Sequence, residues 1–249
     1  MRKVTILLLS ICLAVISQAQ NLDEILENHF NAIGQDKLLD VQTMIVTGKV
    51  MPQGMEIPIK FIQKRPDKIR SEGTFQGQTI ITVYDSGKGW MINPMTGTTD
   101  PVDLGEMQIK QMREQADMDG VLYNWKEKGY QVEFLGTDEM EGTEVYKIKL
   151  VKEDGDENIF YIDTENYLIL KTNLKTNYQG SEVVIDNYFS NYKPVDGILI
   201  PYNMETRMEE QTVNQVVIDT VKLNVEIDDS LFIRPEKSEK DNEDEQKNE

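Results

Sequence analysis

The sequence predicts a mainly β protein of α+β type, built as an incomplete antiparallel β-barrel or strongly curved sheet of about eleven strands. From residue 41 onward, apolar and polar residues alternate with a period of two in short runs, as half-buried strands do. Glycine, proline and aspartate–glycine turns separate these runs by only a few residues, which favours antiparallel neighbours. Helical periodicity occurs in two segments, so we expect an N-terminal helix and a mid-chain helical lid to cover the sheet.

Residues 1–19 have the pattern of an export signal peptide. Arg2 and Lys3 form its basic segment, residues 4–16 its apolar segment, and residues 17–19 a small-x-small cleavage site. The apolar segment is too short to span a membrane. We therefore expect a mature chain that begins at Gln20 and is secreted through the inner membrane into the periplasm, where it is soluble.

The only cysteine, Cys12, lies inside this expected signal peptide. A bacterial lipidation site requires a small residue directly before the cysteine, but Ile11 stands there, so we expect no lipid anchor. A mature chain without cysteine has no disulfide, no thiol nucleophile and no thiolate metal site.

The chain is strongly acidic, with 44 Asp and Glu against 26 Lys and Arg and a formal net charge of −18 at pH 7. Such a charge repels nucleic acid, which we therefore exclude as a partner. Residues 236–249 contain no apolar residue and are predicted to form a disordered, solvated tail. An acidic tail with a function of its own is the alternative. Residues 20–235 are predicted to form a single domain.

The first predicted element is an amphipathic helix over residues 22–33. Apolar side chains recur there at helical spacing, and Gly34 follows where a C-terminal cap is expected. His29, the only histidine, lies on the apolar face of this helix. We expect a partly buried core histidine rather than a metal ligand, because the chain has no second histidine or available cysteine to complete a metal site.

Strand candidates follow before and after the middle of the chain. They are residues 41–50, 55–64, 68–75 and 78–85, and then 130–137, 143–150, 157–163, 167–174, 182–189, 202–209 and 215–225. In the run 143–150, Tyr146, Ile148 and Leu150 alternate with Lys147 and Lys149. One face of the sheet is therefore apolar and the other is exposed to water.

The segment YDSGKGWMINPMTG, residues 84–97, has the glycines and lysine of a phosphate-binding loop or of a hairpin. A phosphate-binding loop needs a longer glycine-rich turn that opens directly into a helix. Here the apolar residues Trp90, Met91 and Ile92 come next, followed by an Asn-Pro turn. The segment therefore predicts a hairpin.

Residues 103–128 interrupt the strands and predict two short helices that separate at Gly120. Apolar residues recur there in a loose helical pattern, namely Leu104, Met107, Ile109, Met112, Ala116, Met118, Leu122 and Trp125. Methionines concentrate between residues 91 and 118. Because methionine is unbranched and adaptable, they either repack around a ligand of variable shape or fill gaps in an irregular core.

The sequence contains no motif of a known catalytic site. It has no G-x-S-x-G elbow, no H-E-x-x-H helix and no second histidine for a relay. Carboxylates are abundant, so a hydrolase that uses paired carboxylates stays open as an alternative. We expect a protein that is not an enzyme, with no catalytic residue, no metal and no cofactor.

Three short motifs, in order along the chain, resemble the periplasmic lipoprotein carriers of the LolA type. They are KRP at residues 64–66, YDSGKGWMINP at residues 84–94 and DDSLFIRP at residues 228–235. The N-terminal helix, the run of strands and the mid-chain insert also fall where that family has them. The resemblance covers residues 20–235.

The resemblance implies an incomplete β-barrel lidded by helices, whose apolar cavity holds the acyl chains of lipoproteins in transit to the outer membrane. It implies an inner-membrane lipoprotein-releasing transporter and an outer-membrane acceptor as partners, and a monomer. It also implies that Arg65, the arginine of the KRP motif, bonds to the lid and holds the empty carrier closed. An exposed charge at a strand end is the alternative for Arg65.

The candidates for lining the cavity or forming the movable lid are Phe30, Trp90, Met91, Leu104, Met107, Met112, Leu122 and Trp125. Gly120 is the expected hinge of the lid. The chain departs from the family in its long strand region after residue 140, its VDGILIPY segment and its acidic tail, which leaves the cargo open. The alternative function is a sensor or interaction domain of the same fold that reads lipid or protein partners in the cell envelope.

Overall fold

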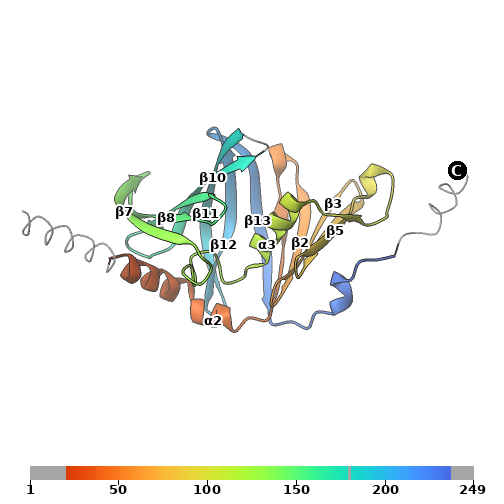
Figure 1. The fold of residues 1–249 in the computed structure, drawn as a ribbon, viewed down its shortest axis with the longest axis horizontal. Helices are drawn as coiled ribbons and strands as arrows, with labels where there is room; N and C mark the ends of the chain where they lie inside the picture. Colours follow the sequence, from red (N-terminus) through yellow and green to blue (C-terminus); the bar gives the residue numbers. More distant parts are fainter. Residues whose placement is uncertain (1–20, 179–180, 237–249) are drawn as a thin grey trace, which may run out of the picture. The chain divides into compact units, whose positions relative to one another are not determined.

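The structure, a computed structural model, describes residues 21–178 and 181–236 (Figure 1). The predicted signal peptide and residues 237–249 of the predicted tail lie outside the described residues. The described chain is mostly β, with thirteen antiparallel strands and a few helices, which confirms the predicted fold class.

The strands before the middle of the chain are β1 (Thr43–Val50), β2 (Ile57–Lys64), β3 (Lys68–Phe75), β4 (Gln78–Asp85), β5 (Lys88–Ile92) and β6 (Val102–Asp103). Those after it are β7 (Gln131–Met140), β8 (Thr143–Val151), β9 (Glu157–Asp163), β10 (Ile169–Tyr178), β11 (Ser181–Val195), β12 (Ile198–Met208) and β13 (Gln211–Leu223). The helices are residues 21–33, α2 (Gln35–Leu39) and α3 (Glu106–Ala116), with single turns η1 (Pro52–Gly54), η2 (Pro94–Thr96) and η3 (Asp229–Phe232). The eleven predicted strands are all present, and β5 and β6 are the two further ones.

The order of hydrogen-bonded strands is β6-β5-β4-β3-β2-β1-β13-β12-β11-β10-β9-β8-β7. Most neighbours are consecutive in sequence, as hairpin connections produce, and β1 beside β13 is the exception. Within the described residues, the end strands β6 and β7 are not paired with each other. The sheet is therefore unclosed, as an incomplete barrel requires.

The chain divides into two compact units, each assembled from two separate segments. The first unit comprises the chain up to Lys37 together with Val121–Val213. The second unit comprises Leu38–Gly120 together with the chain from Asn214 onward. The chain thus leaves the second unit at Gly120, inside the predicted lid.

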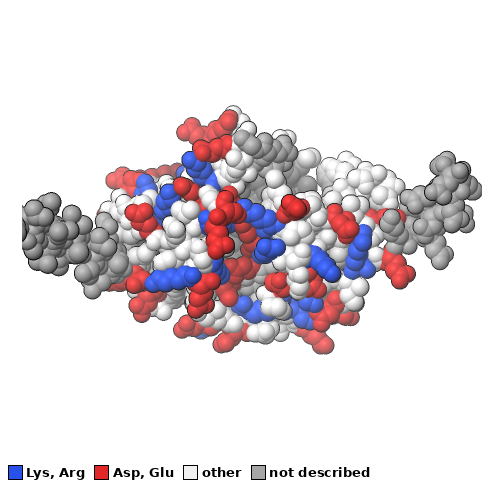
Figure 2. Space-filling model, viewed as in Figure 1, with Lys and Arg blue, Asp and Glu red and all other residues white. Residues whose placement is uncertain are grey.

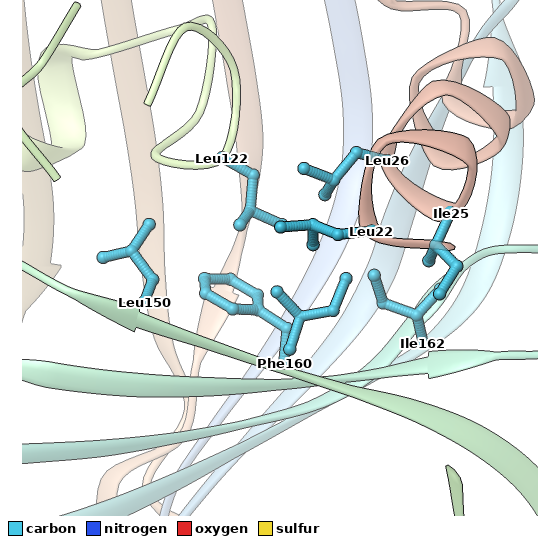
Figure 3. Packing of buried hydrophobic residues seen from close by; sticks show 8 residues of the cluster. Leu22, Ile25, Leu26, Leu122, Leu150, Phe160 and Ile162 are labelled. Carbon is cyan, nitrogen blue, oxygen red and sulfur yellow. The ribbon is translucent and has the colours of Figure 1, made fainter. Parts of the chain in front are cut away.

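The N-terminal helix covers one face of the first unit's sheet, which we call its inner face. Leu22, Ile25 and Leu26 point from the helix toward Phe160 and Ile162 on β9 (Figure 3). Three further members of the same cluster are Leu122, Ile148 and Leu150. Ile148, Leu150 and Ile162 are fully buried. Since burying one aliphatic side chain contributes about 1.5–3 kcal/mol, this cluster is a main source of the unit's stability.

The helix ends where it was predicted to end. Gly34 has φ +76, a left-handed conformation that only glycine adopts without strain. A Cβ atom on Gly34 would also collide with the carbonyl oxygen of Gly197, in the two-residue turn between β11 and β12. This position therefore requires glycine for two independent reasons.

The outer face of the first unit's sheet carries a row of alternating basic and aromatic side chains. Lys171 lies 5.4 Å from the ring centre of Tyr161 and 5.0 Å from that of Tyr188. The ammonium group of Lys147 also lies over the ring of Tyr161. The guanidinium group of Arg207 lies 4.3 Å from the ring centre of Tyr188. Each of the three cations is also paired with a carboxylate. Because each cation has a carboxylate partner, the row is not a free basic patch. On the face of the molecule that Figure 2 shows, basic side chains are interspersed among acidic ones.

Both faces of the second unit's sheet are covered. Helix α3 covers one face, with Leu104, Met112 and Ala116 packed against Ile69 of β3 and Tyr84 of β4. The segment at residues 225–232 covers the opposite face. There it packs against the buried side chains Ile62, Val83 and Trp90.

The prediction of a second helix in the segment at residues 103–128 is wrong. Residues 121–129 form a series of turns and only α3 is helical. Asn124 has φ 51, and Gly120 and Gly129 have φ 79 and φ 73. Three left-handed residues within ten positions prevent a continuous right-handed helix, so the apolar spacing here reflects one side of a compact loop.

The hairpin at residues 84–97 is confirmed. Asp85 pairs with Lys88, and the two residues between them, Ser86 and Gly87, have φ 50 and φ 86. Two left-handed residues form the tight turn whose twist matches the flanking strands. The side chain of Asn93 then accepts a hydrogen bond from the backbone N–H of Met95 and opens the single turn η2.

Candidate functional site

The residues predicted from the sequence fall into two groups, one in each unit. Phe30, Leu122 and Trp125 belong to the first unit. Trp90, Met91, Leu104, Met107 and Met112 belong to the second.

A pocket of about 500 Å³ lies in the first unit beside the N-terminal helix. Phe30, Leu122 and Trp125 all line it, so the structure brings these three predicted residues together. The ring of Phe30 meets that of Tyr123 edge to face, with centroids 5.5 Å apart. The remaining lining residues are Asp23, Leu26, Glu27, Asn31, Gln35, Asp36, Asn124, Lys126 and Glu127.

A second pocket of about 440 Å³ lies along other residues of the same helix. Tyr146 and Tyr167 form part of its wall, with nearly parallel rings 6.0 Å apart, and Phe134 meets Tyr146 edge to face. Burial, followed by the closeness of Tyr167, raises the pKa of Tyr146. Helix residues 23, 26, 27, 30 and 31 face the first pocket, and residues 21, 24, 25 and 28 face this one. The helix therefore lies between two pockets.

His29 is a core histidine, as predicted. Its side chain is 4% exposed, and its Nδ1 lies 2.8 Å from the carbonyl oxygen of Tyr167. Burial lowers the pKa of His29, so the imidazole is neutral near pH 7 and its Nδ1–H donates to that carbonyl. Within the described residues, no group of His, Cys, Asp and Glu is arranged to hold a metal ion.

In the second unit, Leu104 and Met112 are buried beneath α3, and Met91 packs against them from β5. Met107, on the same helix, is 43% exposed. Trp90 points to the opposite face of the sheet, because successive residues of a strand alternate between faces. Its indole N–H donates to the carbonyl of Phe232 at 3.3 Å. Trp90 therefore does not lie below α3 with Met91.

The three sequence motifs meet in the second unit. Lys64, of the KRP motif, is 3.1 Å from the carboxylate of Asp229 in the DDSLFIRP motif, and Lys68 is 3.2 Å from it. These two lysines lower the pKa of Asp229. Trp90, of the hairpin motif, bonds to the same segment at Phe232. Their common task is to hold residues 227–232 against the sheet, a role that the sequence did not reveal.

Arg65 binds three groups of the second unit. Its Nε donates to the carbonyl of Val41 at 2.6 Å, and its Nη2 donates to the carbonyl of Leu38 at 3.1 Å. The same Nη2 pairs with the carboxylate of Asp119 at 2.5 Å. The side chain is 20% exposed, so the alternative of a free charge at a strand end is wrong. Asp119 lies within the predicted lid, and thus Arg65 does contact that segment.

Sequence analysis missed a strip of half-buried apolar side chains on the inner face of β10, β11 and β12. Register places Leu174 opposite Ile185 and Phe189 opposite Met204, all on the same face as Phe160. None of these four residues belongs to the apolar clusters under the helices. We call these four residues the inner strip. Alternation in the sequence indicates that one face is apolar, but it does not tell which part of that face is left uncovered.

A row of polar side chains crosses the inner strip. Thr206 donates to the Asn187 side-chain oxygen at 2.9 Å, and the Asn187 amide donates to Thr172 at 3.5 Å. Thr172 is buried, and it lies directly opposite Phe160. The polar row thus separates two apolar contacts on the inner face, Leu174 with Ile185 on one side and Phe189 with Met204 on the other.

Within the part of the chain that the structure describes, no helix is long and apolar enough to cross a membrane.

The chain has the fold of solved structures that share little sequence with it. A protein of the DUF1329 family from Desulfovibrio piger is 13% identical, with a TM-score of 0.59 over 84% of this chain and 97% of that one. A LolA superfamily protein from Nitrosomonas europaea is also 13% identical, with a TM-score of 0.59 over 85% and 96%. A putative outer membrane lipoprotein-sorting protein domain from Vibrio parahaemolyticus is 12% identical, with a TM-score of 0.53 over 81% and 95%. The likeness in fold confirms the resemblance inferred from the motifs.

A comparison with curated proteins gave no match. A protein-family model with the description "Uncharacterized protein" matches residues 68–236, which is more than half of the 249 residues. The chain therefore belongs to this family, and its fold is similar to that of the LolA superfamily protein from Nitrosomonas europaea.

Proposed function

We propose that this protein is a soluble periplasmic carrier that binds the acyl chains of lipoproteins, or of another lipid, for transport to the outer membrane. The observation that carries the proposal is the inner strip, a half-buried apolar surface outside the three packed clusters. A LolA-like fold, shared with a lipoprotein-sorting domain, supports it. The export signal expected at residues 1–19 supports the periplasmic location.

The energetics of an acyl chain in water explain why such a surface is needed. Each methylene group transferred out of water contributes about 0.8 kcal/mol, so a chain of about sixteen carbons gains on the order of 10 kcal/mol from shelter. The inner strip offers aliphatic, aromatic and thioether side chains side by side. Phe189 offers a large apolar surface, and the flexible side chain of Met204 can adapt to a chain of variable length.

The polar row has a place in the same proposal. An acylated ligand carries an ester or amide group where the chain meets the rest of the molecule. Thr172, Asn187 and Thr206 present hydroxyl and amide groups at the middle of the inner strip. A ligand carbonyl that receives a hydrogen bond there avoids the cost of burying an unpaired polar group.

Arg65 acts in this proposal as the restraint on the segment at residues 103–128. Its bond to Asp119 holds the end of that segment within the second unit when the carrier is empty. Delivery then involves a releasing transporter at the inner membrane and an acceptor at the outer membrane. The carrier works as a monomer and without catalytic groups.

The proposal is tested by mass spectrometry of lipids extracted from the protein after purification from the periplasm of producing cells. We expect acylated species in the wild-type protein and an approximately tenfold or greater loss in Ile185→Asp, because the new carboxylate lies in the apolar contact. Val184→Asp is the matched control, since Val184 is the neighbouring residue on the outer face and is 44% exposed. Absence of acyl species from the wild type would overturn the proposal and favour a sensor or interaction domain, as would an equal loss in both variants.

A further inference from the structure

The pocket of about 500 Å³ beside the N-terminal helix has a composition that an acyl carrier does not require. It lies wholly within the first unit, and three of its lining residues are aromatic, namely Phe30, Tyr123 and Trp125. Its volume falls in the range of about 300–1,000 Å³ that is typical of small-molecule sites. The lining residues determine which class of small molecule fits the pocket.

One contact inside the pocket indicates that its walls can bind a cation. The Lys126 ammonium group lies 4.9 Å from the centre of the Trp125 ring. A cation in this position is attracted by the negative face of the indole, the strongest such face among the side chains. Lys126 is exposed and comes from the same loop, so it can swing away from the ring at little cost. An internal cation thus shows where an external one would bind.

The acidic side chains that line the pocket also favour binding of a cation. Asp23, Glu27, Asp36 and Glu127 line the pocket, and Lys126 is the only basic residue among its lining residues. None of these four acids has an ion-pair partner in the described residues. Nor do they form a group that could hold a metal ion. Carboxylates that are spread around aromatic walls favour a bulky organic cation over a metal ion.

We propose that this pocket binds a small molecule with an alkylated ammonium group, and that the ammonium group takes the place of the Lys126 side chain over Trp125. Aromatic rings and diffuse negative charge are the features by which proteins recognise quaternary ammonium groups. The proposal is independent of acyl binding, because the inner strip lies on β10 to β12 and contributes no residue to this pocket.

The test uses choline as the probe and 3,3-dimethylbutan-1-ol, its neutral isostere, as the matched ligand. Titration is followed by the indole N–H resonance of Trp125 in two-dimensional NMR spectra, where the chain's two tryptophans give two signals. We expect choline to shift the Trp125 resonance in a saturable manner and the isostere to bind at least about tenfold more weakly. Trp90, in the second unit, should not respond.

The decisive variant is Lys126→Met, which removes the internal competitor while keeping the pocket and its walls. We expect choline to bind about threefold or more tightly to this variant, as the removal of one competing cation–π contact predicts. Lys193→Met is the control, since Lys193 also lies over an aromatic ring, that of Tyr202, but outside the pocket. Equal binding of choline and its isostere would overturn the proposal. Unchanged or weaker choline binding in Lys126→Met would also overturn it, and that variant alters only an exposed side chain.

Discussion

Arg65 and Asp119 form an ion pair one residue before the chain leaves the second unit at Gly120. The same guanidinium binds the carbonyl of Leu38, the first residue of the second unit after the chain leaves the first unit. Arg65 therefore joins two chain segments, each at a point where the chain passes between the units. We therefore propose that this single side chain restrains both segments.

The first prediction concerns this restraint. Arg65→Leu removes the ion pair with Asp119 and two hydrogen bonds to the backbone carbonyls of Leu38 and Val41, which costs on the order of 3 kcal/mol locally. We expect faster hydrogen exchange across residues 103–120 in the variant and a larger change in the rate of ligand release than in that of capture. Arg113→Leu is the control, because Arg113 is an exposed arginine of α3. Exchange rates that are the same in wild type and Arg65→Leu would contradict the restraint.

The second prediction concerns the close approach of Gly34 to Gly197. Gly34→Ala introduces a Cβ into contact with the Gly197 carbonyl and forces a left-handed conformation on alanine. We expect the free energy of unfolding in urea to fall by about 2–4 kcal/mol. Gly155 has a similar positive φ, but the space around it is open. Gly155→Ala therefore measures the cost of the left-handed backbone alone, which should be about 1 kcal/mol. Equal losses in the two variants would show that the contact is not tight.

The third prediction concerns the pH dependence that His29 confers. Its pKa in the folded protein is lowered from 6.5 by burial, so the unfolded chain binds more protons than the folded one between the folded pKa and 6.5. His29 stabilises the fold at neutral pH, and this contribution declines as the pH falls below 6.5. We expect the unfolding free energy to fall less in His29→Asn than in wild type between about pH 7.5 and about pH 5.5. Parallel pH profiles for the two proteins would contradict the role of this histidine.

The fourth prediction concerns the basic and aromatic row on the outer face of the first unit. Lys171 contacts Tyr161 and Tyr188 and pairs with Asp186 at 3.1 Å, and its side chain is only 16% exposed. Lys171→Met removes the ion pair and leaves that carboxylate with the hydrogen bond from the Asn173 amide, and we expect a loss of about 1–3 kcal/mol in chemical unfolding. Lys175→Met is the control on the same strand, since its pair with Glu182 is well exposed to solvent and contributes little to stability. A loss no larger than that of the control would show that the row does not stabilise the sheet.

The strands were predictable because their alternation is a local property of the sequence. Tyr146, Ile148 and Leu150 face the helix and the lysines between them do not, as the pattern indicated. The hairpin at Ser86 and Gly87 was predictable for the same reason, since its turn chemistry lies in adjacent residues. Each of these features needs information from only a few neighbouring positions.

The features that were not predictable depend on distant parts of the chain. Trp90 was expected to line the cavity or lid together with Met91. Its side chain instead bonds to the carbonyl of Phe232, which is more than a hundred residues away in the sequence. The apolar residues of the 121–129 segment imitate a helical period, and the left-handed Asn124 that breaks it leaves little trace in the sequence. Ile185 and Phe189 lie on the inner face but outside the cluster beneath the N-terminal helix, and the position of that helix cannot be read from the local sequence.

The end strands of the sheet determine how safely such an apolar surface can be kept in solution. β6 has only two residues, Val102 and Asp103, and so offers almost no backbone for another molecule to pair with. β7 is longer, but it carries a bulge at Leu135, between Phe134 and Gly136, and exposed acids at Asp138 and Glu139. Short, kinked and charged margins of this kind resist edge-to-edge aggregation. The edges of this sheet therefore oppose the edge-to-edge pairing through which a sheet with an apolar face could aggregate.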